Sequence, residues 1–444
     1  MALGSFKKVV LGSVAFAIFW ILAVFPAVPF LPIGRTAGSI LGATLMVIFE
    51  VITPKQAYDA INLPVLGLLF GTMVVSIYLE RADMFKHLGV LFSWKSWGAK
   101  DMLCRICIVS AISSALFTND TACFFLTEFI LKIARENNIR PEPFLLGLAS
   151  SSNIGSSATP IGNPQNLIIA IQSGISFGEF VLGLLPAVLV GVFVNALILI
   201  CMFWKLLSDV KEEEDALDEL IVQEDSESGP QQSAEESKGQ LNRWKRLSWK
   251  LCIYLGTVGM LVAFLMGVDM SWTALTTALI FVILDFKDAG PCLEKVSYSV
   301  LVFFCGMFIT VYGFNRTGIP SSFWNLMEPH ARIDHASGIA VLAIVILVLS
   351  NVASNVPTVL LLGAKVVASA TAISPGEEKK AWLILAWVST VAGNLSLIGS
   401  AANLIMCEQA LRAHPSYTIT FWSHLKFGVP STLIVTAIGL ALVY

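Results

Sequence analysis

The chain has 444 residues, of which 56% are hydrophobic and 13% are charged, and its formal net charge is −3. A soluble protein of this length cannot bury so much apolar surface, so the composition excludes that class and predicts an all-α polytopic membrane protein. The net charge says nothing about partners, and the sequence contains no basic patch of the kind that binds nucleic acid.

Three apolar segments open the chain, at about Val9–Phe30, Ala37–Ile52 and Leu63–Leu79, with Pro-rich or charged breaks between them. They approach the length of about 20 residues that a helix needs to cross a bilayer. The amphipathic stretch Arg81–Lys100 follows and combines cations with Trp side chains. This composition is typical of a segment that lies at the depth of the lipid head groups.

Two short apolar arms come next, Met102–Phe117 and Ala122–Ile133, and the polar residues Thr118-Asn-Asp-Thr121 lie between them. A helix rises only 1.5 Å per residue, so each arm is short for a full crossing. The pattern predicts a re-entrant hairpin over residues 102–133 that enters and leaves the membrane on one side.

The segment 144–171 is apolar at both ends and polar in its middle. Gly155, Pro160, Gly162 and Pro164 interrupt the helix that its apolar ends predict. A bilayer core offers no water to unpaired backbone groups, so unwound chain persists there only inside protein or beside a cavity. The sequence therefore predicts a broken helix that builds a polar site at mid-membrane, as transporters do. A further span at about Phe180–Trp204 completes the first half.

Residues 207–247 differ sharply in composition from both halves. Acidic residues dominate Lys211–Gln240, with Ser, Gln, Gly and Pro between them, and basic residues close the segment. Such a composition cannot bury enough apolar surface to order itself, so we expect a flexible linker. The positive-inside rule places this linker, and most other Lys and Arg, in the cytoplasm, with both chain ends outside.

The second half repeats the pattern of the first. Its spans are expected at about Leu251–Met266, Trp272–Phe286, Tyr298–Phe314 and Phe427–Val443. A second hairpin is predicted over residues 338–370 and a second broken helix over residues 381–410. The domains are then a first repeat, residues 1–206, and a second repeat, residues 248–444, on either side of the linker.

Matching motifs support this repeat. Ile161-Gly162-x-x-x-Asn166 corresponds to Ile398-Gly399-x-x-x-Asn403, and Asn119 and Thr121 of the first hairpin correspond to Asn355 and Thr358 of the second. Paired interruptions at corresponding positions of two halves are a sequence pointer to a transporter site. Each half makes an odd number of crossings, so we expect the repeats to be inverted in the membrane.

The candidate substrate-binding residues carry amide or hydroxyl groups. They are Asn119, Thr121, Ser157, Thr159, Asn163, Asn166, Ser354, Asn355, Thr358, Asn394, Ser396, Ser400 and Asn403. The motifs contain no Arg or Lys, although helix N-termini would add oriented N–H groups for an anion. A dicarboxylate or phosphate therefore stays open beside a neutral polyhydroxy solute, which needs both donors and acceptors.

Asp120 places an acid at the tip of the first hairpin. A charged side chain at the bilayer centre costs about 2.5–3.5 kcal/mol on insertion scales and often marks an ion or proton pathway. We therefore predict Asp120 as a proton-coupling residue, with a helix cap as the alternative role. Glu128, two turns further along, is a secondary proton-coupling candidate, with snorkelling as its alternative.

The sequence contains no nucleophile–base pair, phosphate loop or metal cluster, so we expect no enzyme activity, no metal and no cofactor. Cys104-x-x-Cys107 has a redox or metal spacing, but it lies in an apolar helical segment without nearby His. The five histidines fall in loops or at the ends of spans, and none of them is assigned a role.

The polar motifs resemble those of a known family. Phe117-Thr-Asn-Asp-Thr121, Ser156–Asn166 and Gly393–Asn403 resemble the ion transporter superfamily that includes bacterial arsenite efflux pumps. The opening segment Phe25–Gly38 and the block Asn119–Asn166 are more similar still to plant silicon efflux transporters. The resemblance extends nearly end to end, apart from the acidic linker.

The resemblance implies proton-driven export of silicic acid from the cell across the plasma membrane, with arsenite as a second substrate. It also implies a homodimer, a scaffold formed by the first three spans of each half, and an elevator-type transport unit formed by the hairpins and broken helices. Related dicarboxylate carriers have Ser-Asn-Thr tips, whereas this chain has Thr118-Asn-Asp-Thr121 and Ser354-Asn-Val-Pro-Thr358. This departure puts sodium and dicarboxylate binding in doubt.

Two alternatives to a proton-driven exporter remain open. One is a sodium-coupled carboxylate or cation antiporter of the same superfamily. The other is a membrane receptor or scaffold that binds a ligand without moving it. Paired broken helices argue against the receptor, because a membrane scaffold has no evident need for them.

Overall fold

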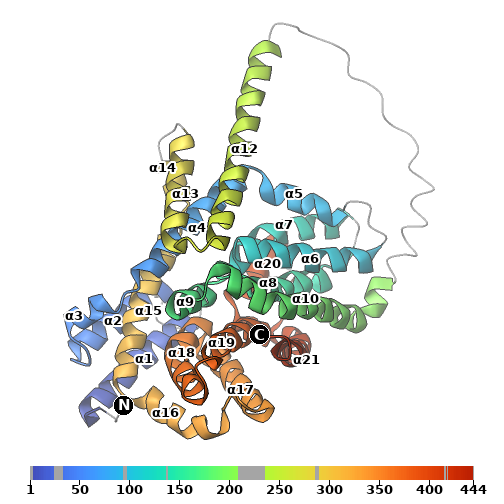
Figure 1. Cartoon of the computed structure of the whole chain (residues 1–444). Coiled ribbons are helices and arrows are strands. Elements are labelled where there is room, and N and C mark those ends of the chain that lie inside the picture. Colours follow the sequence, from blue (N-terminus) through green and yellow to red (C-terminus); the bar gives the residue numbers. More distant parts are fainter. Residues whose placement is uncertain are drawn as a thin grey trace.

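The computed structural model of the chain describes residues 4–24, 34–93, 98–136, 139–208, 236–285, 290–414, 417 and 419–443. Within these ranges every regular element is a helix (Figure 1). Seven of the described helices are long and apolar enough to cross a membrane. The prediction of an all-α polytopic membrane protein is confirmed.

Three helices from each half form an elongated layer, on the left of Figure 1. Its members are α1 (Phe6–Val24), α2 (Arg35–Ile48), α4 (Leu63–Arg81), α12 (Glu236–Leu265), α13 (Met270–Leu284) and α15 (Tyr298–Arg316). The halves interleave, because α2 packs against α15 and α4 packs against α13. Helices α4 and α13 can pack closely because residue 71 of α4 is a glycine. A Cβ at this position would lie 2.7 Å from the backbone of Ala274 of α13.

The remaining long helices form a compact bundle beside this layer. From the first half it takes α6 (Ala99–Leu116), α7 (Asn119–Glu136), α8 (Glu142–Ser156), α9 (Pro164–Ser173) and α10 (Phe177–Met202). From the second half it takes α17 (Ala336–Ala353), α18 (Asn355–Ile373), α19 (Glu377–Val391), α20 (Ala401–Ala413) and α21 (Phe421–Leu440). Two 3₁₀ turns, η2 (Ala392–Asn394) and η3 (Leu397–Gly399), lie between α19 and α20.

Short helices lie between the long ones. Helices α5 (Met84–Ser93), α16 (Ile319–Met327) and η1 (Glu328–His330) connect the layer to the bundle, whereas α3 (Pro54–Asp59) and α14 (Gly290–Leu293) connect helices within the layer. Helix α5 lies within the segment expected at the head groups, of which residues 94–97 are outside the described part of the chain. Most of the expected linker, residues 209–235, is outside it too, and α12 begins at Glu236, before the expected end of the linker at residue 247.

The packing of the bundle repeats between the halves. In the first half α6 packs on α8, as α17 packs on α19 in the second. Across the halves, α7 packs on α20 and α18 packs on α9. The helices that correspond in sequence therefore have corresponding neighbours, as an internal repeat requires.

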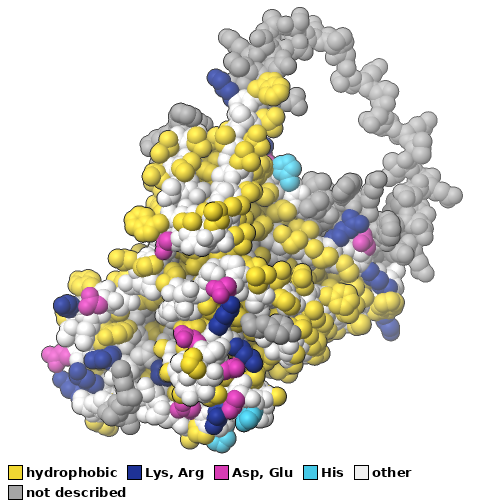
Figure 2. All heavy atoms as spheres, in the orientation of Figure 1, with side chains coloured by type: hydrophobic (Ala, Val, Ile, Leu, Met, Phe, Trp, Pro, Cys, Tyr) yellow, Lys and Arg dark blue, Asp and Glu magenta, His cyan; other side chains and the backbone are white. Residues whose placement is uncertain are grey.

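Hydrophobic side chains cover much of the face in Figure 2, and many of its charged side chains lie in the lower part of the view. Large apolar residues are exposed along the long helices, among them Leu182, Phe193 and Leu255. Such a surface is stable in contact with lipid rather than water.

Candidate functional site

The two broken helices stabilise their unwound segments in the same way. Asn166 of α9 donates from Nδ2 to the carbonyl oxygens ten and seven residues before it, at 3.1 and 3.4 Å. Asn403 of α20 donates to the carbonyl oxygens at the same two sequence separations, at 2.8 and 3.1 Å. Unwound backbone leaves carbonyl groups unpaired, and in each half one buried amide satisfies two of them. The sequence correspondence of Asn166 and Asn403 is therefore also a structural one.

A buried network of amides is centred on Asn153 of α8, whose side chain is 1% exposed. Its Oδ1 accepts hydrogen bonds from Asn119 Nδ2 and from Ser400 Oγ, both at 2.9 Å. Its Nδ2 donates to the Oδ1 atoms of Asn394, at 2.8 Å, and Asn403, at 3.1 Å. Asn153 thus joins the first hairpin to both broken helices through a single side chain.

A second polar cluster surrounds Thr390, the residue of the second half that corresponds to Asn153. Thr390 of α19 donates to Asn166 Oδ1 at 3.2 Å and accepts from Asn163 Nδ2 at 3.2 Å. Asn163 also donates to Ser156 Oγ at 2.9 Å. Thr390 precedes Asn403 by the same number of residues as Asn153 precedes Asn166. The corresponding residues Asn153 and Thr390 therefore each bind the broken helix of the other half.

Both hairpin tips carry a non-glycine residue with a positive φ. The angle is 135° at Thr118 and 74° at Ser354, and an Asn follows in each case. Such angles cost about 1–3 kcal/mol and persist only where the surroundings enforce them. The Asn119 N–H donates to Gly162 O at 3.1 Å, which fixes the first tip on the first broken helix. At the second tip, Asn355 Oδ1 is buried and has no hydrogen-bond partner.

Four of the predicted hydroxyl residues lie outside the Asn153 network and form two groups. Ser157 and Thr358 bond back to carbonyl oxygens of their own helices, at 2.5 and 2.9 Å, and take no part in the amide network. Thr159 donates to the α6 backbone at 2.5 Å, and Ser396 donates to Asn351 of α17 at 2.8 Å. These two hydroxyls tie each broken helix to the first arm of its own hairpin.

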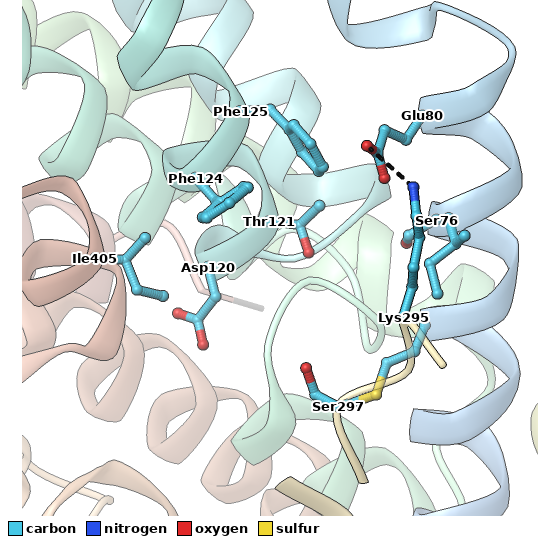
Figure 3. A pocket seen from close by; sticks show the side chains of 11 residues that line it. Ser76, Glu80, Asp120, Thr121, Phe124, Phe125, Lys295, Ser297 and Ile405 are labelled. Atoms are coloured by element: carbon cyan, nitrogen blue, oxygen red, sulfur yellow. Dashed lines mark ion pairs between the residues drawn. The ribbon is translucent and has the colours of Figure 1, made fainter. Parts of the chain in front are cut away.

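A cavity of about 470 Å³ separates the first hairpin from the layer (Figure 3). It is lined by Met73, Ser76, Ile77 and Glu80 of α4, Asp120, Thr121, Phe124 and Phe125 of α7, Lys295 and Ser297 before α15, and Ile405 of α20. In Figure 3, Asp120 and Thr121 point into this space from α7, and Ser297 lies across from them. Lys295 and Glu80 form an ion pair on the far wall, with Nζ and Oε1 3.9 Å apart.

Asp120 is the acidic residue that α7 presents to this cavity. The cap of α7 is formed by Thr118, whose Oγ1 accepts from the Thr121 N–H at 3.3 Å, so the carboxylate of Asp120 is not needed as a cap. Glu128 lies on the same helix, is exposed, and is outside the cavity lining.

Sequence reasoning missed three residues of this site: Asn153, Thr390 and His424. Asn153 and Thr390 lie in continuous helix before the Gly and Pro breaks, so no local signal marks them. His424 is 1% exposed within α21, and its Nε2 lies 3.1 Å from Asn394 O. The correspondence between the halves is the one signal that points to Asn153 and Thr390 as a pair.

The network combines amides and hydroxyls, which both donate and accept hydrogen bonds. Its members include no Lys or Arg, so it matches an uncharged polar solute better than an anion. Within the described part of the chain, no group of three or more His, Cys, Asp or Glu residues is arranged to hold a metal ion.

Comparisons with known proteins agree with this architecture. A family model described as "Citrate transporter" (CitMHS) matches residues 17–392. The silicon efflux transporter LSI3 of Oryza sativa subsp. japonica is 54% identical over 480 residues, which cover 100% of this chain and 99% of LSI3. The putative transporter arsB of Dictyostelium discoideum is 31% identical over 503 residues, which cover 93% of this chain and 88% of that protein.

Among solved structures, the YdaH transporter of Alcanivorax borkumensis matches with a TM-score of 0.54 and 13% sequence identity, over 98% of this chain and 97% of YdaH. This likeness concerns the fold. The family match covers most of the chain, and the two broken helices and their hairpins supply the interruptions expected of a transporter. The chain therefore belongs to the citrate transporter family and is a multi-pass membrane transporter.

Proposed function

We propose that this transporter exports silicic acid from the cell in exchange for protons. The observation that carries the proposal is Asp120, the acid at the tip of the first hairpin, which lines the cavity and follows Asn119 of the Asn153 network. The identity of 54% to a silicon efflux transporter over the full length of the chain supports the choice of substrate.

The proposed substrate matches the chemistry of the network. Silicic acid is neutral at cellular pH, and each of its hydroxyl groups both donates and accepts hydrogen bonds. The side chains of Asn119 and Ser400 offer the same combination, and both belong to the network next to the cavity-lining hairpin. A neutral solute needs no compensating charge when it is desolvated, which fits the network around Asn153, whose members are Asn and Ser side chains.

Protons fit the coupling role better than sodium. A carboxyl group such as that of Asp120, which lines the cavity, gains and loses one proton as its access to water changes.

We further propose that the bundle moves as an elevator against the layer and that the repeats are inverted. The cavity extends along α4 from Met73 to Glu80, toward the C-terminal end of this helix. Asp83, just beyond that end, forms an ion pair with Lys250 of α12. Because the linker before α12 is expected in the cytoplasm, we infer that this structure is open to the inside. The layer is then the scaffold, and the bundle carries the solute.

Three further parts of the proposal rest on the resemblance: arsenite as a second substrate, a homodimer, and a place in the plasma membrane. The description of the matching family as a citrate transporter favours one alternative, a sodium-coupled carboxylate carrier. Lys295, which lines the cavity, is the cation that such a substrate would meet first.

The test is efflux of silicic acid from proteoliposomes under an imposed pH gradient, with germanic acid as tracer. Asp120→Asn is expected to lower gradient-driven flux by about tenfold or more, since a barrier change of about 1.4 kcal/mol is a factor of ten. Glu128→Gln tests the secondary proton-coupling candidate on the same helix. Because Glu128 is exposed and outside the cavity lining, we expect this variant to keep most of the flux, and an equal loss of flux would assign coupling to both acids.

Full pH-driven flux in Asp120→Asn would remove the coupling role from this residue. Flux that follows a sodium gradient and ignores the pH gradient would favour the carboxylate carrier, which a parallel citrate assay would then identify. Binding of silicic acid without flux under either gradient would indicate the receptor.

A further inference from the structure

His424 lies in the first turn of α21 and is buried against the unwound segment of the second broken helix. Its side chain is 1% exposed, and its Nε2 lies 3.1 Å from the carbonyl oxygen of Asn394. Gly428, one turn further along, allows this approach, because a Cβ there would lie 2.4 Å from Asn394 O and 2.7 Å from Leu395 O. Helix α21 therefore meets the unwound backbone at van der Waals distance, with one imidazole directed at it.

Asn394 is a member of the network around Asn153, and each of its side-chain polar atoms is engaged there. Its Oδ1 accepts from Asn153 Nδ2 at 2.8 Å, and its Nδ2 donates to Ser150 O at 3.1 Å. The imidazole binds the same residue through the main chain. His424 thus acts on the backbone that carries the Asn394 amide, without contacting the cavity itself.

The partners of the ring fix its protonation state. A carbonyl oxygen only accepts, so Nε2 must carry the hydrogen. Nδ1 is buried and has no hydrogen-bond partner among the described residues, so a proton on Nδ1 would place an unsatisfied donor and a charge in the protein interior. The contact therefore requires a hydrogen on Nε2, and the burial of Nδ1 favours the neutral ring.

We propose that His424 is a positioning residue for the transport site. The neutral imidazole holds the unwound segment between η2 and η3 in the geometry that brings the Asn394 amide onto Asn153. The first test below measures silicic acid efflux and therefore rests on the proposed function. The second test measures the protonation of the ring and does not rest on that function.

The transport test compares two variants of His424 in proteoliposomes. His424→Leu removes the donor, and we expect the KM for silicic acid to rise by about tenfold, the factor that corresponds to one weakened hydrogen bond to a binding-site residue. His424→Gln keeps an N–H donor that reaches the same carbonyl, and we expect its KM to return to within about threefold of the wild-type value. His330→Leu, a change of an exposed histidine, is the control.

A merely structural role would lower the melting temperature and the flux of both variants together and leave KM unchanged. That outcome, or a His424→Leu protein with wild-type KM, would overturn the proposal. A thermal unfolding curve of each purified variant distinguishes loss of folding from loss of positioning.

The second readout is independent of the substrate. In ¹⁵N-histidine-labelled full-length protein, the His424 signals are identified by their absence from the His424→Gln spectrum. We expect nitrogen shifts of a neutral ring with its hydrogen on Nε2 at pH 7. A ring protonated on Nδ1 would overturn the proposal, even if wild-type protein carried no silicic acid and the proposed function had failed.

Discussion

Asn153 shows how one neutral side chain can organise a membrane site. Its carboxamide makes four hydrogen bonds to residues of the first hairpin and the second broken helix. A buried amide left without partners costs about 1–3 kcal/mol, so complete satisfaction is what makes this arrangement stable at membrane depth. Thr390 performs the equivalent task in the other half with a smaller side chain. The site is thus asymmetric, with more polar groups on the side of the first hairpin.

Replacing Asn153 by Ala should destabilise the protein and abolish transport. The change leaves Asn394 Oδ1 and Asn403 Oδ1 without their donor, and two unsatisfied buried acceptors cost on the order of 2–6 kcal/mol. Thermal unfolding of the purified variant measures the loss. Ser157→Ala is the matched control, because Ser157 bonds only to its own helix and should shift stability by less than about 1 kcal/mol. Equal melting temperatures for the two variants would contradict the central role of Asn153.

The sequence predicted that the site is built from amide and hydroxyl groups, but it did not identify all of the residues that form it. Asn119, Asn394, Ser400 and Asn403 were recognisable because Gly, Pro or a polar hairpin tip stands beside them. Asn153 was not, because an Asn within a continuous helix has the same local signature whether it faces lipid, a neighbour or a site. Only the tertiary fold decides that direction.

Helix α5 connects the layer to the bundle, and Asp83 anchors its start. Asp83 has a φ of 67°, and its carboxylate binds Lys250 at 2.5 Å and Lys86 at 2.8 Å, with Arg246 at 3.4 Å. Hydrogen bonds from Lys250 and Lys86 hold the pKa of Asp83 well below its usual range. The carboxylate therefore fastens α5 to the start of the membrane-spanning part of α12, on the side where the linker ends.

The anchor predicts a specific pH dependence. Because the pKa of Asp83 is lower in the folded protein than in the unfolded chain, its contribution to stability is fully present above the ordinary pKa of about 3.9 and is lost as the pH falls toward the folded value. Asp83→Asn should lower the melting temperature by a few degrees at pH 7, and the difference from wild type should shrink below about pH 4. Unfolding curves in nanodiscs between pH 7 and pH 3 measure this. Glu50→Gln, at an exposed residue, should show no such difference, and a constant gap for Asp83→Asn at all pH values would exclude the anchor.

Hydropathy and the positions of Gly and Pro predict where the individual helices lie along the chain. The arms of both hairpins and the segments of both broken helices lie within a few residues of their expected positions. Hydropathy does not predict which helices pack together, since lipid and protein neighbours select the same apolar residues. The interleaving of α2 with α15 and of α4 with α13 therefore became visible only in the structure.

For the whole molecule, the two faces of the bundle meet the layer differently. On the side of the first hairpin a cavity separates α7 from α4. On the side of the second hairpin, Asn315 of α15 donates to Leu360 O of α18 at 3.4 Å and accepts from Lys365 Nζ at 3.0 Å. A cavity thus separates the first hairpin from the layer, while the second hairpin is bonded to it directly. The proposed elevator movement would have to break the contact between Asn315 and Lys365.

Cross-linking this contact tests the movement directly. In a background without native cysteines, Asn315→Cys and Lys365→Cys can be joined by a short bis-methanethiosulfonate, which forms a reducible disulfide with each thiol. If the bundle moves against the layer, the joined protein should lose silicic acid flux, and reductive cleavage of the link should restore it, because the second hairpin cannot move against the layer while α15 and α18 are tied. The single variants Asn315→Cys and Lys365→Cys, treated with the same reagent, control for the loss of the native contact. Full flux in the joined protein would mean that α18 and this part of α15 stay together throughout transport, and the moving boundary would then have to lie elsewhere in the bundle.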